Sequence, residues 1–141
     1  MRKSTILLVM AVLMGVFGVA GSCAAQRFVK SPDGQTVTDT RTKLMWAVRD
    51  NGSEIAWTPG KEYCLGYTGG GYTDWRMPAR VELVELCNAG GRSVINITAY
   101  VWSFDTEGYQ GWFVNFDNCL WGLYPWSSGS NLRVLPVRKA Q

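Results

Sequence analysis

The chain has 141 residues, with 14 lysines and arginines, 11 aspartates and glutamates and no histidine, so its formal net charge is +3. The lack of histidine excludes Ser-His-Asp and Cys-His catalysis and most zinc sites. The small net charge excludes a basic field that would recruit nucleic acid, and the length suits one domain rather than two.

The N-terminal segment has the pattern of an export signal. Arg2 and Lys3 precede a run from Thr5 to Ala20 that carries no charge and is too short for a stable membrane span. We therefore expect a signal peptide over residues 1–25 and a single exported domain over residues 26–141. Without Arg2 and Lys3, the mature net charge is +1.

The sequence allows two alternative cleavage sites for the signal peptide. Ala20-Gly21-Ser22-Cys23 resembles the bacterial lipobox, although a large aliphatic residue is usual where Ala20 stands. Cleavage before Cys23 would leave a lipid anchor on that residue, and this anchor would be the only contact with the membrane. Cleavage after Ala25 would release a protein without an anchor.

The first predicted element of the domain is a β-hairpin. Residues 36–39 and 44–47 have the composition of short strands, and residues 40–43 between them that of a turn.

Two short helices are predicted next. The first begins at Trp57-Thr58-Pro59, with Thr58 as the N-cap and Pro59 at the first helical position, and runs through Cys64. The second begins at Pro78, has apolar residues at helical spacing and stops at Gly90-Gly91.

The pattern after the second helix is that of β-structure. Strands are predicted over Ser93–Asn96, Val101–Phe104, Trp112–Phe116 and Leu132–Val137. The stretch from Asp105 to Asn131, which contains one of these strands, combines glycines with aromatic residues and is expected to be mostly a long irregular loop. The predicted fold class is therefore α+β, with two short helices packed on small antiparallel sheets.

Three cysteines lie in the folded domain: Cys64, Cys87 and Cys119. One disulfide with one remaining thiol is the simplest outcome for an exported protein, and the spacing leaves the pairing open.

Several sequence blocks occur in an order that carries a resemblance. They are Asp33-Gly34-x-Thr36-Val37-Thr38-Asp39, Leu44-Met45-Trp46, Gly70-Gly71-Tyr72-Thr73-Asp74-Trp75-Arg76-Met77-Pro78, Val101-Trp102-Ser103, Trp112-Phe113-Val114-Asn115-Phe116 and Arg133-Val134-x-Pro136-Val137-Arg138. The chain resembles the domain family typified by the C-terminal domain of the Legionella collagen-like adhesin. The resemblance implies a C-type-lectin-like fold and a surface module, because the best-understood member binds sulfated glycosaminoglycans at the cell surface.

Three departures from the family pattern affect the structure that we expect. Lys43 stands where the family usually has Gly, and Ala79 stands where it has a polar helix cap. The cysteine that some members carry in the last strand is absent, since Leu135 and Pro136 occupy that stretch, so no disulfide is carried over from the family.

The motif block around Trp75 is interpreted as structural. Asp74 and Arg76 are expected to form a polar knot before the second helix. Four tryptophans are expected to be core anchors: Trp46, Trp75, Trp102 and Trp112.

The ligand-binding surface is predicted within Asp105–Asn131. Aromatic rings with polar neighbours hold sugars, because the apolar face of a sugar ring desolvates against the ring face. The candidate contacts are the aromatic residues Tyr109, Trp121, Tyr124 and Trp126, with the basic residues Arg133, Arg138 and Lys139 as further contacts for an anionic glycan.

The sequence thus predicts an exported envelope or surface module that binds a polysaccharide or a sulfated glycan. The alternative is a structural or protein-interaction domain of the cell envelope that binds no glycan. No enzymatic activity, cofactor or metal is expected. Oxygen ligands for calcium are present between residues 105 and 118, but the calcium motifs of true C-type lectins, Glu-Pro-Asn and Trp-Asn-Asp, are missing.

Overall fold

The structure, a computed structural model, describes residues 25–141. The predicted lipidation site Cys23 and the apolar run of the signal lie outside the described residues. In chain order the elements are β1 (Phe28–Lys30), β2 (Thr36–Asp39), β3 (Leu44–Ala47), α1 (Trp57–Leu65), the 3-10 turn η1 (Gly69–Gly71), α2 (Arg80–Asn88), the 3-10 turn η2 (Gly91–Ser93), β4 (Tyr100–Glu107), β5 (Gln110–Asn115), β6 (Leu120–Pro125), β7 (Leu132–Arg133) and β8 (Val137–Lys139).

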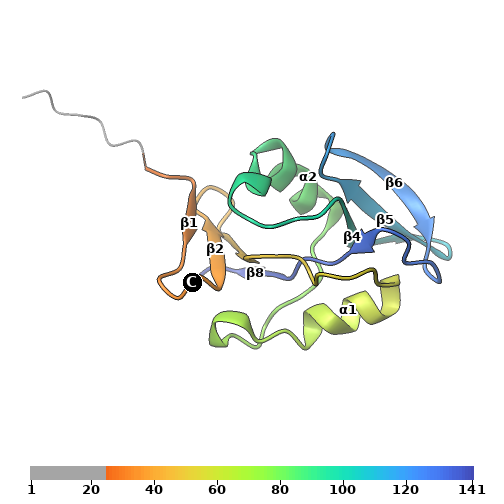
Figure 1. The fold of residues 1–141 in the computed structure, drawn as a ribbon, viewed down its shortest axis with the longest axis horizontal. Coiled ribbons are helices and arrows are strands. Elements are labelled where there is room, and N and C mark those ends of the chain that lie inside the picture. The colour runs from red at the N-terminus through yellow and green to blue at the C-terminus, as the bar shows by residue number, and fades with distance from the viewer. Residues whose placement is uncertain (1–24) are drawn as a thin grey trace, which may run out of the picture.

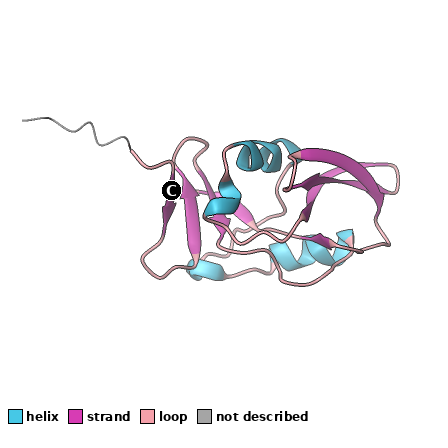
Figure 2. Ribbon diagram, turned by 45° about the horizontal axis from the view of Figure 1, so that its top comes forward, coloured by secondary structure: helices cyan, strands magenta, loops and turns pink. Residues whose placement is uncertain are grey.

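The strands of the described residues form two four-stranded sheets, with the orders β1-β2-β3-β8 and β6-β5-β4-β7. All neighbours are antiparallel except β4 and β7. The two sheets lie at opposite ends of the molecule, and α1 and α2 lie on opposite sides of it (Figures 1 and 2). The α+β class, with two short α-helices and two small sheets in residues 25–141, agrees with the sequence prediction. No helix in this part of the chain is long and apolar enough to cross a membrane.

The predicted hairpin is confirmed. Its register runs from Thr36 opposite Ala47 to Asp39 opposite Leu44, and Lys43 in the turn has a φ of 59°. The turn therefore needs the left-handed conformation that Gly adopts without steric cost.

The first helix is confirmed, but its predicted N-cap is wrong. Ala56 occupies the N-cap position, so Thr58 is inside the helix and Pro59 is its third residue. Proline is tolerated there because the first N–H groups of a helix have no partner within the helix. The helix begins earlier because the Trp57 N–H finds a tertiary acceptor, the Trp126 carbonyl, at 3.2 Å.

The second helix is confirmed, although it begins at Arg80 rather than at Pro78, and it is capped from a distance. Ala79 has no side-chain acceptor, and its own N–H donates to Glu82 Oε1 at 2.7 Å. The N–H of Arg80 donates to Oδ2 of Asp105, which lies on β4, at 2.6 Å. Asp105 thus supplies a carboxylate acceptor at a helix end that also favours negative charge.

Two strand predictions near the ends of the β-rich half are wrong. Ser93–Asn96 is mostly turn, because η2 ends at Ser93 and only Asn96 forms a bridge, to Arg49. Leu132–Val137 is divided between β7 and β8, which belong to different sheets. The residues between these two strands are fully buried, because here the chain crosses from one hydrophobic cluster to the other.

The stretch from Asp105 to Asn131 is mostly strand rather than loop. The end of β4, all of β5 and all of β6 form an antiparallel meander, and irregular chain is confined to the turns and to residues 126–131. The polar-apolar alternation that marks a strand is weak here because aromatic residues occupy both faces of the sheet.

Two hydrophobic clusters lie on either side of the β4–β5 pair. Val101 and Val114 belong to the cluster with Leu83 and Leu86 of α2. Trp102, the next residue after Val101, belongs to the cluster with Trp57 of α1. Adjacent residues of a strand point to opposite faces, so this sheet is packed between the two helices.

Three of the four expected tryptophan anchors are confirmed. Trp46, Trp75 and Trp102 are buried, and the indole N–H of Trp75 donates to the Gly69 carbonyl at 3.1 Å. Trp112 is only half-buried, and its ring faces the Arg80 guanidinium at 4.3 Å, so its assignment to the core is wrong.

The cysteines form one disulfide with one remaining thiol, as predicted. Cys87 of α2 is bonded to Cys119 in the turn between β5 and β6. Cys64 is free and buried in α1, and burial raises the pKa of its thiol to about 12.

The strained turn gives a first testable prediction. Lys43→Gly should raise the free energy of unfolding by about 1 kcal/mol, because Gly has no Cβ to oppose a positive φ. Lys43→Ala removes the same charge but keeps the Cβ, so it should give no such gain. Urea unfolding of both variants and the parent measures the difference. Equal stability of the Gly and Ala variants would contradict the assigned turn conformation.

Candidate functional site

An open hollow with a volume of about 280 Å³ lies on the face of the second sheet that packs toward α1. We call it the aromatic pocket. Its lining residues come from β4, β5, β6, β7 and the segment before β7, and they are Tyr100, Phe113, Tyr124, Ser130, Asn131 and Leu132. The volume is near the lower end of small-molecule pockets, about 300 Å³.

Strand register brings the three rings to one face. Phe113 lies opposite Trp102, and its neighbours along the sheet place Tyr100 and Tyr124 on the same side. The Tyr100 and Phe113 rings meet edge to face at 5.6 Å, and the Phe113 and Tyr124 rings do so at 6.5 Å. Such pairs are stabilised by the positive edge of one ring on the negative face of the next, so the rings hold one another in place.

Gly122 leaves room for the Phe113 ring on β6. It lies directly opposite Phe113, and a Cβ on Gly122 would be 3.1 Å from the Phe113 ring. The absence of a side chain lets the Phe113 ring lie close to the backbone of β6.

Polar groups border the rings. The side chains of Ser130 and Asn131 are exposed, and Asn131 has a φ of 61°. Within residues 25–141, neither these side chains nor the hydroxyls of Tyr100 and Tyr124 form a hydrogen bond to another residue of the protein. The pocket thus combines apolar ring faces with donors and acceptors that are free for a ligand, and no charged side chain lines it.

Tyr124 is the one predicted contact residue that lines the pocket. Trp126 stacks on Trp57 at 5.2 Å and supports the α1 side of the sheet. Tyr109 is 85% exposed at the turn between β4 and β5, and its ring meets the Trp126 ring at 6.0 Å. Two of these three aromatic residues therefore lie outside the pocket itself.

Trp121 faces the opposite side of the sheet. It pairs across the strands with Val114, which belongs to the α2 cluster, and it borders a second hollow with Arg80 and Val81 of α2. The structure therefore separates Trp121 from Tyr124, which the sequence had placed on a common surface.

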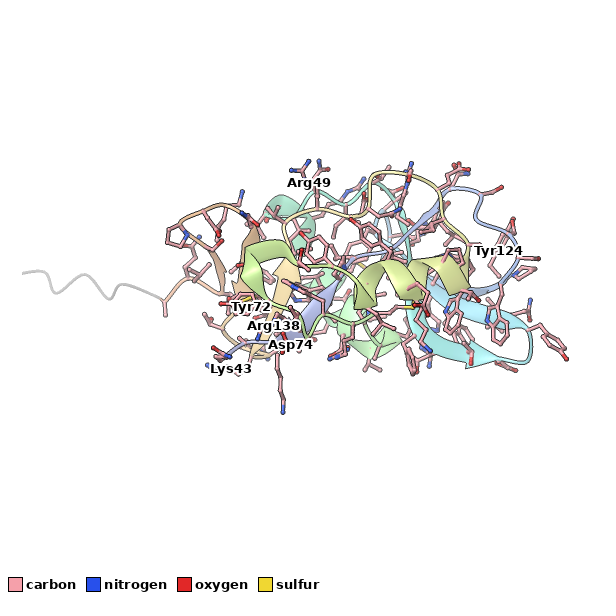
Figure 3. The ribbon with its side chains drawn as sticks, turned by 90° about the horizontal axis from the view of Figure 1, so that it is seen from below. Lys43, Arg49, Tyr72, Asp74, Tyr124 and Arg138 are labelled. Carbon is pink, nitrogen blue, oxygen red and sulfur yellow. A yellow bond between two sulfur atoms is a disulfide. The ribbon has the colours of Figure 1, made fainter. Side chains whose placement is uncertain are left out.

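Arg138, a predicted ligand contact, is buried. Its side chain is 2% exposed, and its Nε donates to Asp74 Oδ1 at 2.6 Å while the guanidinium covers the Tyr72 ring at 3.7 Å. These residues lie at the end of the molecule away from Tyr124 (Figure 3). The burial follows from β8, which is paired on one side with β3 and carries Arg138 opposite Met45.

The polar knot before α2 is confirmed in more detail than the sequence allowed. Arg76 donates two hydrogen bonds to the Glu82 carboxylate, at 2.7 and 2.8 Å. The hydrogen bonds from Arg138 hold the pKa of Asp74 below its usual value.

The remaining basic candidates do not frame the aromatic pocket. Lys139 is exposed on β8, in the other sheet, and Arg133 is half-buried on β7 beside Leu132. Asp105, a candidate calcium ligand, is engaged at the start of α2. No group of three or more cysteines and carboxylates in residues 25–141 is arranged to hold a metal ion.

Sequence reasoning missed Tyr100, Phe113, Ser130 and Asn131 as pocket residues. Tyr100 and Phe113 could have been identified because their rings lie on the same face of adjacent strands as the Tyr124 ring. This shared face becomes visible only when residues 120–125 are assigned as a strand.

The burial of Arg138 gives a second prediction. Arg138→Ala should lower the free energy of unfolding by about 2–4 kcal/mol, as expected for truncation of a large buried side chain whose stem packs against its neighbours. Lys139→Ala, at the exposed neighbouring position, should change it by less than about 0.5 kcal/mol. Thermal and urea unfolding provide the comparison. Similar stabilities for the two variants would show that Arg138 is not a core residue.

Comparison with known proteins agrees with the resemblance seen in the sequence. No curated protein matches the chain. A family model described as the Lcl C-terminal domain matches residues 35–138, a range that runs from β2 to β8 and includes every residue of the aromatic pocket. The chain belongs to the Lcl C-terminal domain family.

Proposed function

We propose that this domain is an exported surface module that binds carbohydrate in the aromatic pocket. The observation that carries the proposal is the combination of three packed rings with four unbonded polar groups around one open hollow. A sugar ring has an apolar face and a rim of hydroxyls, so it can pack on Tyr100 or Tyr124 while Ser130 and Asn131 bind its hydroxyls.

A neutral sugar fits this pocket better than a sulfated one. No arginine or lysine lines it, and Arg138 is already paired with Asp74. An anionic group would therefore find no cation in the pocket to offset the loss of its hydration. The ligand class that we propose is a neutral glycan or the uncharged residues of a longer polysaccharide.

Membership of a family associated with a surface adhesin supports a location outside the cytoplasm. Lipidation of Cys23 is a proposal that rests on the lipobox-like sequence alone. A C-type-lectin-like fold is likewise proposed, and the presence of the first and last strands in one sheet supports it.

Binding without catalysis is part of the proposal. The chain has no histidine, and the high pKa of Cys64 keeps its buried thiol protonated and unreactive at neutral pH. Nothing in the lining of the aromatic pocket is titratable except the two tyrosines, which suits recognition rather than acid–base chemistry.

A glycan array with the domain of residues 26–141, followed by calorimetry, tests the proposal. Asn131→Gly should weaken binding about tenfold, because it removes the amide while keeping the positive φ that Gly tolerates. Tyr124→Ala should weaken binding by a similar or larger factor, about 1–2 kcal/mol.

Lys139→Ala is the matched control, because it alters an exposed residue of the other sheet, and its affinity should equal that of the parent. Affinity should also stay constant as salt is raised, since no ion pair is expected in the pocket. Binding that requires Lys139 and weakens in salt, or parent protein that binds no glycan, would contradict the proposal.

A further inference from the structure

The outer strand of the second sheet is an unprotected edge. β6 has β5 on one side and no strand on the other, and it is the outermost strand of its sheet in Figure 1. Its six residues, Leu-Trp-Gly-Leu-Tyr-Pro, include no charge. Natural edge strands are usually blunted by lysines, prolines or bulges, because their free amide and carbonyl groups pair with other chains.

The backbone of β6 has hydrogen-bonding capacity left over. In an antiparallel pair, every second residue directs its N–H and C=O away from the neighbouring strand. Among residues 25–141, none outside β5 hydrogen-bonds to the backbone of Trp121 or Leu123. Pro125, which lacks an N–H, stands only at the last position.

Exposed apolar side chains accompany this edge. Leu120 is 61% exposed and Trp121 is 51% exposed. Beside Trp121, between β6 and α2, is a hollow of about 200 Å³ that is also bordered by Val81, itself 69% exposed. By contrast β1, one of the two edge strands of the other sheet, has only three residues and carries Lys30.

We propose that β6 pairs antiparallel with β6 of a second copy of this chain, about a two-fold axis near Gly122. The β6-β5-β4-β7 sheet of one copy would then join the same sheet of the second copy into one continuous sheet. The resulting interface would be isologous, because each copy contributes the same strand.

The sequence of β6 is self-complementary in this register, which favours a second copy over an unrelated strand. With Gly122 opposite Gly122 of the partner subunit, Trp121 meets Leu123 of the partner subunit on the α2 side of the sheet. On the other side, Leu120 meets Tyr124 of the partner subunit. Each pair joins an aromatic residue to an aliphatic one, and such cross-strand pairs stabilise sheets.

Charge does not oppose this pairing. β6 carries none, and the hollow between β6 and α2 has one cation and one anion, Arg80 and Glu85. The mature chain has a net charge of only +1, so two copies repel one another weakly.

The two-fold axis would place both aromatic pockets on one face of the joined sheet, although the pairing does not depend on what those pockets bind.

Analytical ultracentrifugation of the domain of residues 26–141 tests the proposal. The parent should dimerise reversibly, and Leu120→Lys and Trp121→Lys should each raise the dimer dissociation constant tenfold or more. Val29→Lys is the matched control, because Val29 is an exposed apolar residue on the edge strand β1 of the other sheet, and it should leave dimerisation unchanged. Melting temperatures close to that of the parent verify that the variants are folded.

Hydrogen exchange distinguishes strand pairing from simple stacking of side chains. The amides of Trp121 and Leu123 should exchange more slowly as protein concentration rises, while those of β1 should not change. A parent that stays monomeric, a dimer that survives both lysine substitutions, or a dimer without protection of β6 would each overturn the proposal.

Discussion

Two reciprocal hydrogen bonds join β4 to the start of α1 and to the segment just before it, at the end of the molecule that carries the aromatic pocket. The indole N–H of Trp57 donates to the Ser103 carbonyl, and the indole N–H of Trp102 donates to the Ile55 carbonyl, both at 2.8 Å. A buried indole N–H without a partner costs about 1–3 kcal/mol, so these two hydrogen bonds favour the observed positions of both rings. This arrangement depends on the absence of a side chain at Gly111. A Cβ atom there would lie 2.6 Å from the Trp57 ring and 2.9 Å from the Trp102 ring.

The pocket is a consequence of that constraint. Once Trp102 faces α1, strand alternation sets Tyr100 on the same face, and the register of β5 and β6 adds Phe113 and Tyr124. The ion-paired end of the domain, built on Asp74 and Arg138, is remote from this face (Figure 3). The arginine and carboxylate there are engaged with one another, and the aromatic pocket is lined by uncharged aromatic, polar and aliphatic groups.

Sequence alone predicted the features that depend on local chemistry. The hairpin of β2 and β3 and the start of α2 follow from turn and proline signals within a few residues. The cap that Asp105 provides comes from 25 residues away, and no local pattern reveals it. The same holds for Arg138, whose burial depends on the distant residues Tyr72 and Asp74, and for β6, where aromatic residues on both faces hide the strand period. Because the strand period of β6 is hidden, the predicted ligand surface contained Tyr124 but not its actual neighbours in the sheet.

The central claim is that the aromatic pocket holds a neutral sugar. The most direct measurement is a titration followed through the ring ¹H–¹³C resonances of the domain, with a neutral oligosaccharide selected on a glycan array. The account predicts shifts of Tyr100, Phe113 and Tyr124 and of the Asn131 side-chain amide, with no shift of Trp121 on the opposite face of the sheet. Shifts at Trp121 and α2 while the three pocket rings stay unchanged would contradict it.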